Sequence, residues 1–179
     1  MTTSDIRTAI EGLSRLLAEQ PAKARSRNPA ATATLESGLG CTVQGPHGER
    51  LQTDMPPALG GTGSAPNPGW LLRAAIASCT ATVIATRAAQ LGVDLQTLEV
   101  TVDSESDVRG MLGFDESVPA GLFGFRMQVR IGAPGQTPER LREIAAWANR
   151  HSPVGCALDP AGVPELGVEV VDAPATIPG

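Results

Sequence analysis

Residues 74–86, between two arginines, carry no charge, and this run limits the folds open to the chain. Asn67 and Pro68 before it are typical of a helix start, with a capping residue followed by a proline in the first turn. Gly92 offers the left-handed residue that commonly ends a helix. A helix that is apolar or small on every side has to be covered on most sides. We therefore predict a central core helix, and one of its faces carries Leu72, Ile76, Cys79 and Val83.

The first 29 residues are predicted to form an accessory helix and a linker. Thr3 or Ser4 can cap a helix, and Pro21 stops it. Residues 21–29 are rich in proline and basic side chains, as a linker is. The helix itself is indicated by apolar residues that recur at helical spacing, namely Ile6, Ile10, Leu13 and Leu17.

The rest of the chain mixes short strands with few helices. A helix is expected from Thr137 and Pro138, and a second, short one from Ser152 and Pro153. Because β and α segments alternate too rarely for a doubly wound sheet, we predict one α+β domain over residues 30–172, followed by a tail, 173–179, that frays. Strands are predicted at 31–35, 41–44, 50–53, 95–102, 123–131 and 167–171.

Composition excludes several classes of function. The net charge is −5, no tyrosine is present and no basic stripe exists, so nucleic acid is an unexpected partner. The longest apolar stretch, 69–89, is interrupted by Arg73 and Arg87, which favours a core helix over a membrane span. The N-terminus carries Asp5 and has no apolar segment of the kind found in signal peptides. We therefore expect a cytoplasmic protein.

The cysteines and histidines are too scattered to form a metal site. Three cysteines, at positions 41, 79 and 156, accompany two histidines, His47 and His151. No zinc-type spacing can be built from them, and neither a metal nor another cofactor is expected. Without an export signal, three cysteines predict free thiols in a reducing compartment.

Cys79, within the central helix, has two interpretations. A free cysteine often acts as a small apolar side chain in a core, and periodicity alone favours this interpretation. Alternatively, it is a nucleophile. The interior of a helix does not activate a thiol as a helix N-terminus does, so a nucleophilic Cys79 needs a cation brought from elsewhere in the structure.

Five segments together resemble a known family. They are 60–63 (GGTG), 67–72 (NPGWLL), 77–80 (ASCT), 107–110 (DVRG) and 152–154 (SPV). In order and spacing they are similar to segments of the OsmC/organic hydroperoxide resistance family, in its OsmC-like branch, and the likeness extends over roughly residues 30–171. It implies antiparallel sheets around two central helices and an intertwined homodimer. It also implies reduction of hydroperoxides by a cysteine pair, whose first member matches Cys79.

The chain departs from the family's catalytic pattern at three places. Ser152 stands where the second cysteine is expected, and Gly69 replaces a glutamate that commonly follows the helix-opening proline. The arginine that hydroperoxide-resistance members carry in the first hairpin has no clear match in residues 34–38. The nucleophile is therefore retained, whereas its activating pair and its resolving partner are not visible.

Two side chains offer compensation for the missing resolving group. Cys156 lies four residues after Ser152, so in a helix both point the same way, and Cys156 is either a displaced resolving thiol or a packing residue. His151 either hydrogen-bonds a thiolate or caps the C-terminus of its helix. Cys41, in a strand of alternating pattern, is interpreted as core or surface filler.

Several arginines are candidates for the activating cation. Arg109 lies in a family-like segment, and its alternative role is to hold a loop carboxylate such as Asp107 or Asp115. The other candidates are Arg25, Arg27 and Arg50.

The sequence thus supports two hypotheses about function. The first is a thiol-dependent peroxidase that reduces organic hydroperoxides in oxidative-stress defence. Its substrate would enter beside the loop 56–68, and an external thiol or dithiol would regenerate the enzyme. The second is a non-catalytic protein of OsmC-like fold that binds a small apolar ligand at the dimer cleft. Retention of Cys79 favours the first, and the replacements at the family's catalytic positions favour the second.

Overall fold

The computed structural model describes residues 2–158 and 165–171, and the chain divides into two compact units. One unit comprises Met1–Arg15 and Arg73–Gly179, and the other comprises Leu16–Leu72. The predicted tail, 173–179, lies outside the described residues.

The predicted N-terminal helix is present as α1, Thr3–Glu19, and a short 3-10 helix, Pro21–Ala24, follows it. Its cap is Thr2, one residue earlier than the capping residues expected from the sequence. The Thr2 hydroxyl accepts a hydrogen bond from the Asp5 amide at 3.2 Å, and the Asp5 carboxylate accepts one from the Thr2 amide at 2.8 Å. This reciprocal pair satisfies two donors that the first turn of a helix leaves free.

The three strands predicted before the central helix form one antiparallel sheet. β1 is Thr32–Ser37, β2 is Gly40–Gln44 and β3 is Arg50–Thr53, with β2 in the middle. The turn between β1 and β2 contains Gly38 at φ 57°, a left-handed conformation that glycine adopts without steric cost. A 3-10 helix, Pro57–Leu59, lies in the loop that follows β3.

The uncharged run, residues 74–86, lies within the helix α2, Pro68–Gln90, as predicted. The Asn67 side chain caps its first turn by accepting a hydrogen bond from the Trp70 amide at 2.8 Å, and Gly92 follows its end at φ 68°. The buried face differs from the one expected, because Cys79 and Val83 are only half-buried. The described chain covers one side of the helix, and the buried residues are Ile76, Thr80, Ile84, Ala88 and Ala89.

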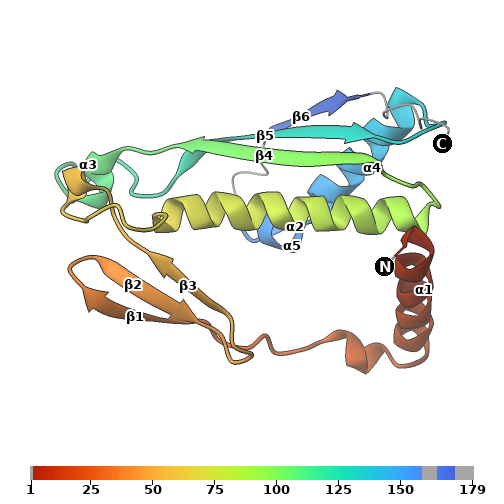
Figure 1. Cartoon of the computed structure of the whole chain (residues 1–179), viewed down its shortest axis with the longest axis horizontal. Helices are drawn as coiled ribbons and strands as arrows, with labels where there is room; N and C mark the ends of the chain where they lie inside the picture. Colours follow the sequence, from red (N-terminus) through yellow and green to blue (C-terminus); the bar gives the residue numbers. More distant parts are fainter. Residues whose placement is uncertain (1, 159–164, 172–179) are drawn as a thin grey trace, which may run out of the picture. The chain divides into compact units, whose positions relative to one another are not determined.

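A second sheet accompanies α2 from Arg73 onwards (Figure 1). β4 is Thr97–Glu105, β5 is Phe123–Gly132 and β6 is Glu165–Val170, in the order β4-β5-β6. β4 and β5 are antiparallel, whereas β5 and β6 are parallel because a helical crossover connects them. The α+β class predicted from the sequence is confirmed, with one sheet antiparallel and the other mixed.

Three further helices belong to the same unit. They are α3, Val108–Met111, α4, Pro138–Arg150, and α5, Pro153–Cys156. Thr137 caps α4, where its hydroxyl accepts a hydrogen bond from the Arg140 amide at 3.2 Å. The predicted inner face of α4 is confirmed as buried, namely Leu141, Ile144, Ala145 and Ala148. Alternate residues of β5 complete the core, namely Met127, Val129 and Ile131.

Among the described helices, α2 is long and apolar enough to cross a membrane by length and composition alone. One such helix is weak support for a membrane span, because a core helix of a globular protein passes the same test.

The core assignment predicts that Leu141→Ala destabilises the chain by about 2–5 kcal/mol, because the substitution leaves a cavity at a side chain that is fully buried. Urea unfolding measures this loss. The control is Arg142→Ala, at an exposed position on the same helix, which should change the free energy of unfolding by less than about 0.5 kcal/mol. Equal effects of the two substitutions would contradict the assignment.

Candidate active site around Cys79

Cys79 lies on α2 with its thiol half-buried, next to a contact between α2 and α5. The neighbouring residue, Thr80, is fully buried, and its hydroxyl donates to the Ser152 hydroxyl at 3.3 Å. Ser152 stands at the position that the resemblance assigns to a second cysteine. The fold therefore brings Ser152 into contact with α2 at Thr80, the residue that follows Cys79.

Ser152 is held in place by the local helix as well as by Thr80. It is 0% exposed and caps α5, where its side chain accepts a hydrogen bond from the Gly155 amide at 3.3 Å. A side chain with a buried hydroxyl and two hydrogen-bond partners has little freedom to move. Ser152 thus acts structurally to hold the start of α5 against α2.

Cys156 lies about one helical turn beyond Ser152, as predicted, but its thiol is engaged elsewhere. Its amide donates to the Ser152 carbonyl at 2.8 Å, and its side chain is exposed. The sulfur lies 3.4 Å from the carbonyl oxygen of Arg150, at the end of α4. In this conformation the Cys156 thiol points to the end of α4, whereas the Ser152 hydroxyl contacts Thr80 of α2.

His151 is held at the end of α4 by two contacts with Trp147. The His151 Nδ1 lies 2.7 Å from the Trp147 carbonyl oxygen, and the two rings stack with centroids 3.8 Å apart. Both contacts fit the capping interpretation of His151, because they satisfy a carbonyl that the helix end leaves free.

Arg109 is paired with loop carboxylates. Its guanidinium donates to both oxygens of Asp107, and one nitrogen lies 4.0 Å from Asp115. The hydrogen bond to Asp107 raises the pKa of Arg109 and lowers the pKa of Asp107. A Cβ on Gly110 would lie 2.5 Å from the Pro119 carbonyl oxygen, so this position requires glycine. In the structure, the segment 107–110 serves to close its own loop.

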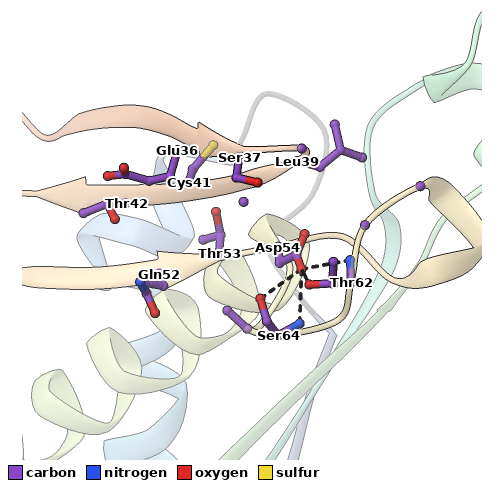
Figure 2. Close-up of a pocket in the computed structure, with 15 residues that line it drawn as sticks. Glu36, Ser37, Leu39, Cys41, Thr42, Gln52, Thr53, Asp54, Thr62 and Ser64 are labelled. Atoms are coloured by element: carbon purple, nitrogen blue, oxygen red, sulfur yellow. Dashed lines mark hydrogen bonds between the residues drawn. The ribbon is translucent and has the colours of Figure 1, made fainter.

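In the other unit, Asp54 organises the loop 56–68 (Figure 2). Asp54 is 3% exposed and accepts hydrogen bonds from both the amide and the hydroxyl of Thr62 and of Ser64, over distances of 2.6–3.1 Å. It also accepts one from the Met55 amide at 2.8 Å. These bonds, with the Thr62 hydroxyl first, hold the pKa of the Asp54 carboxyl far below its usual range.

The loop closes so tightly around Asp54 that Gly61 is required. A Cβ on Gly61 would lie 1.9 Å from the Met55 carbonyl oxygen, which no side chain can do without moving the backbone. Sequence analysis did not identify Asp54 as important. Asp54 directly follows a strand and precedes a glycine-rich loop. This position could have predicted its role, because aspartate commonly accepts hydrogen bonds from the backbone amides of a turn.

A cavity of about 250 Å³ lies between this loop and the strands of the same unit. Cys41 and Thr42 contribute to its lining, and the Thr42 hydroxyl is buried without a hydrogen-bond partner among the described residues. Other polar side chains around the cavity are Glu36, Ser37, Gln52, Thr53, Asp54, Thr62 and Ser64. The lining is more polar than expected for a loop that admits an apolar substrate.

Comparisons with known proteins agree on one family and one fold. Residues 61–165 match the family model for OsmC-like protein. No curated protein matches the chain. An organic hydroperoxide resistance protein OsmC from Legionella pneumophila has a similar structure, with 22% identity, 82% of this chain and 98% of that chain covered, and a TM-score of 0.59.

Two further solved structures are similar. An OsmC-like protein from Mycoplasma pneumoniae is 16% identical, with 83% of this chain and 99% of that chain covered and a TM-score of 0.67. An organic hydroperoxide resistance protein from Elizabethkingia anophelis is 20% identical, with coverages of 83% and 98% and a TM-score of 0.60. At such identities the likeness establishes the fold.

The network around Asp54 predicts that Asp54→Asn lowers the melting temperature near neutral pH by several degrees and makes stability less sensitive to acid. The folded-state pKa lies below the usual 3.8, so the ionised carboxyl stabilises the fold above that value. This contribution is lost as the pH falls through 3.8 toward the lower folded-state pKa. Thermal unfolding gives the melting temperatures, and urea unfolding at about pH 7 and about pH 3 gives the difference in the free energy of unfolding.

The control for this experiment is Asp94→Asn, at an exposed position, which should change the free energy of unfolding by less than about 0.5 kcal/mol near neutral pH. If wild type and Asp54→Asn lose the same stability between the two pH values, Asp54 is not the group that holds the loop.

Proposed function

We propose that this chain, which belongs to the OsmC-like protein family, reduces organic hydroperoxides with the thiol of Cys79. The observation that carries the proposal is the half-buried Cys79 on α2, beside the buried contact between Thr80 and Ser152. Thr80 and Ser152 both lie within residues 61–165, which match the family model. Two proteins of similar fold are named organic hydroperoxide resistance proteins, which further supports this class of substrate.

In the proposed reaction, the Cys79 thiolate attacks the terminal oxygen of the hydroperoxide. The S–O bond forms as the O–O bond breaks, and the alkoxide that leaves takes a proton to become an alcohol. Sulfur is oxidised to a sulfenic acid and the peroxide oxygen is reduced, so electrons and atoms balance. A half-buried thiol suits this step because it is open to a small substrate and partly shielded from bulk water.

A second thiol has to complete the cycle. It condenses with the sulfenic acid, a disulfide forms and water is released. The donor is either Cys156, after its thiol leaves the Arg150 carbonyl, or an external thiol. An external dithiol then reduces the disulfide by exchange and restores Cys79. We place this cycle in the cytoplasm, where thiols stay reduced.

The active form is proposed to be a homodimer. The described chain buries one stripe of α2 and leaves its other sides half-buried or exposed, although residues 74–86 of this helix carry no charge. Trp70, at the start of the helix, is 50% exposed. A second copy that packs on these sides would remove apolar surface from water, which is the main driving force of association. It would also bring further side chains close to Cys79.

The alternative function, binding of a small apolar ligand without catalysis, is favoured by one specific observation. Of the arginines considered as the cation that activates the Cys79 thiol, Arg109 is the one in the same unit as Cys79. Its guanidinium is paired with Asp107 and Asp115 and not with the thiol. A protein of this class would bind an organic hydroperoxide without consuming it. Loss of peroxide in solution therefore distinguishes the two functions.

The peroxidase proposal predicts that Cys79→Ser abolishes the consumption of cumene hydroperoxide in the presence of dithiothreitol. A serine hydroxyl is not ionised at neutral pH and cannot replace the thiolate. Cys41→Ser is the matched control, because it removes a half-buried thiol from the other unit and should leave the rate nearly intact. Equal rates in wild type and Cys79→Ser would rule out the mechanism.

The dimer proposal predicts a solution mass of twice the 18.4 kDa of one chain at micromolar concentration, measured by light scattering without detergent. Thr82→Lys should shift the protein toward the monomer, because Thr82 is exposed on α2 and a buried lysine there would lack a partner. Thr8→Lys, on the exposed surface of α1, is the control and should remain dimeric. A monomeric wild type would defeat the proposal.

A further inference from the structure

A second, open cavity of about 410 Å³ is lined by the C-terminal end of α2 and one side of α4, and Cys79 is not among its lining residues. One side of α4 contributes residues three to four positions apart. Arg87 in the last turn of α2 and Leu91, directly after that helix, also line the cavity. All of these residues belong to one compact unit. The α4 residues are Arg140, Glu143, Ile144, Ala146, Trp147 and Arg150.

The cavity carries an excess of positive charge. Arg140 is neutralised by Glu143, with the charged atoms 3.3 Å apart. Arg87 donates to the neutral Gln90 side chain at 3.2 Å. Among the side chains of residues 2–158 and 166–171, no carboxylate lies within 4.0 Å of Arg87 or Arg150. Two unneutralised guanidinium groups at one cavity stand out in a chain whose net charge is −5.

The remaining lining is apolar and firmly held. The Arg87 guanidinium lies 4.6 Å from the centre of the Trp147 ring, and His151 stacks on that ring at 3.8 Å. Ile144 is fully buried, and Leu91 is half-buried beside the cavity. A ligand here would meet two cations and an apolar wall.

We propose that this cavity binds a small organic carboxylate with an apolar body. Arg87 and Arg150 hold the carboxylate, because the planar guanidinium matches its two oxygens. Leu91, Ala146 and the accessible part of Trp147, which are all half-buried, contact the body. The apolar lining favours such a ligand over an inorganic anion, because an inorganic anion would leave the apolar side chains exposed to water. The site requires no reaction at Cys79, so its test is independent of the proposed peroxidase function.

The direct test is a titration with hexanoate, followed by the fluorescence of Trp147. Trp70→Phe leaves Trp147 as the sole tryptophan, since the chain contains two. We expect a saturable change in emission that weakens as salt is added. Hexanamide, which has the same body without the charge, should bind about tenfold or more weakly, as should inorganic phosphate, which lacks the body.

Calorimetry on three variants locates the carboxylate. Arg87→Gln and Arg150→Gln should each weaken hexanoate binding by about tenfold or more. Arg142→Gln should not, because Arg142 pairs with Glu139 and does not line the cavity. Arg150 is exposed, so its variant remains informative if Arg87→Gln does not fold.

Four results would overturn the proposal. One is absence of saturable hexanoate binding at millimolar concentration, and another is equal affinity for hexanoate and hexanamide. The third is equal weakening by Arg142→Gln and Arg150→Gln. Binding of phosphate as tight as that of hexanoate would reject the organic body and leave an unselective anion site.

Discussion

Four residues of α2, spaced four apart, form the contact on which the Cys79 unit is built: Ile76, Thr80, Ile84 and Ala88. All are buried, and alternate residues of β5 belong to the same core. Complete burial of an isoleucine side chain contributes about 1.5–3 kcal/mol, so two of them supply a substantial part of the stability of a domain. The same contact orients Cys79. Because Thr80 points into the core, its neighbour is turned to the flank of the helix and stays partly accessible.

The family-like segments owe much of their sequence to backbone constraints. Gly61 and Gly110 each leave no room for a Cβ, and both lie in loops closed by an aspartate, Asp54 and Asp107. Ser152 holds a helix start and Asn67 caps a helix. These residues would be needed to build the fold whether or not the protein reacts with peroxides. The chemical part of the resemblance therefore depends mainly on Cys79.

Local patterns predicted much of the fold. The start of α2 at Pro68, the bounds of β3 and the buried face of α4 follow from caps, turns and periodicity, which act over a few residues. The buried side of α2 could not be predicted, because a helix apolar on every side has no periodicity that marks one face. The parallel pairing of β5 with β6 and the bonds from Thr62 and Ser64 to Asp54 depend on contacts between segments, which no local pattern contains. For the candidate site, the sequence identified Cys79 and Ser152 but not the role of Thr80.

The central claim, that Cys79 is the thiol that reduces hydroperoxides, is tested most directly by a single turnover. Reduced protein is treated with one equivalent of cumene hydroperoxide, free thiols are then blocked, and the protein is digested without reductant for peptide mapping. The account predicts one equivalent of the alcohol and oxidation of Cys79, either as a sulfenic acid or in a disulfide with Cys156, while Cys41 stays reduced. An unmodified Cys79 thiol with the peroxide intact would contradict it.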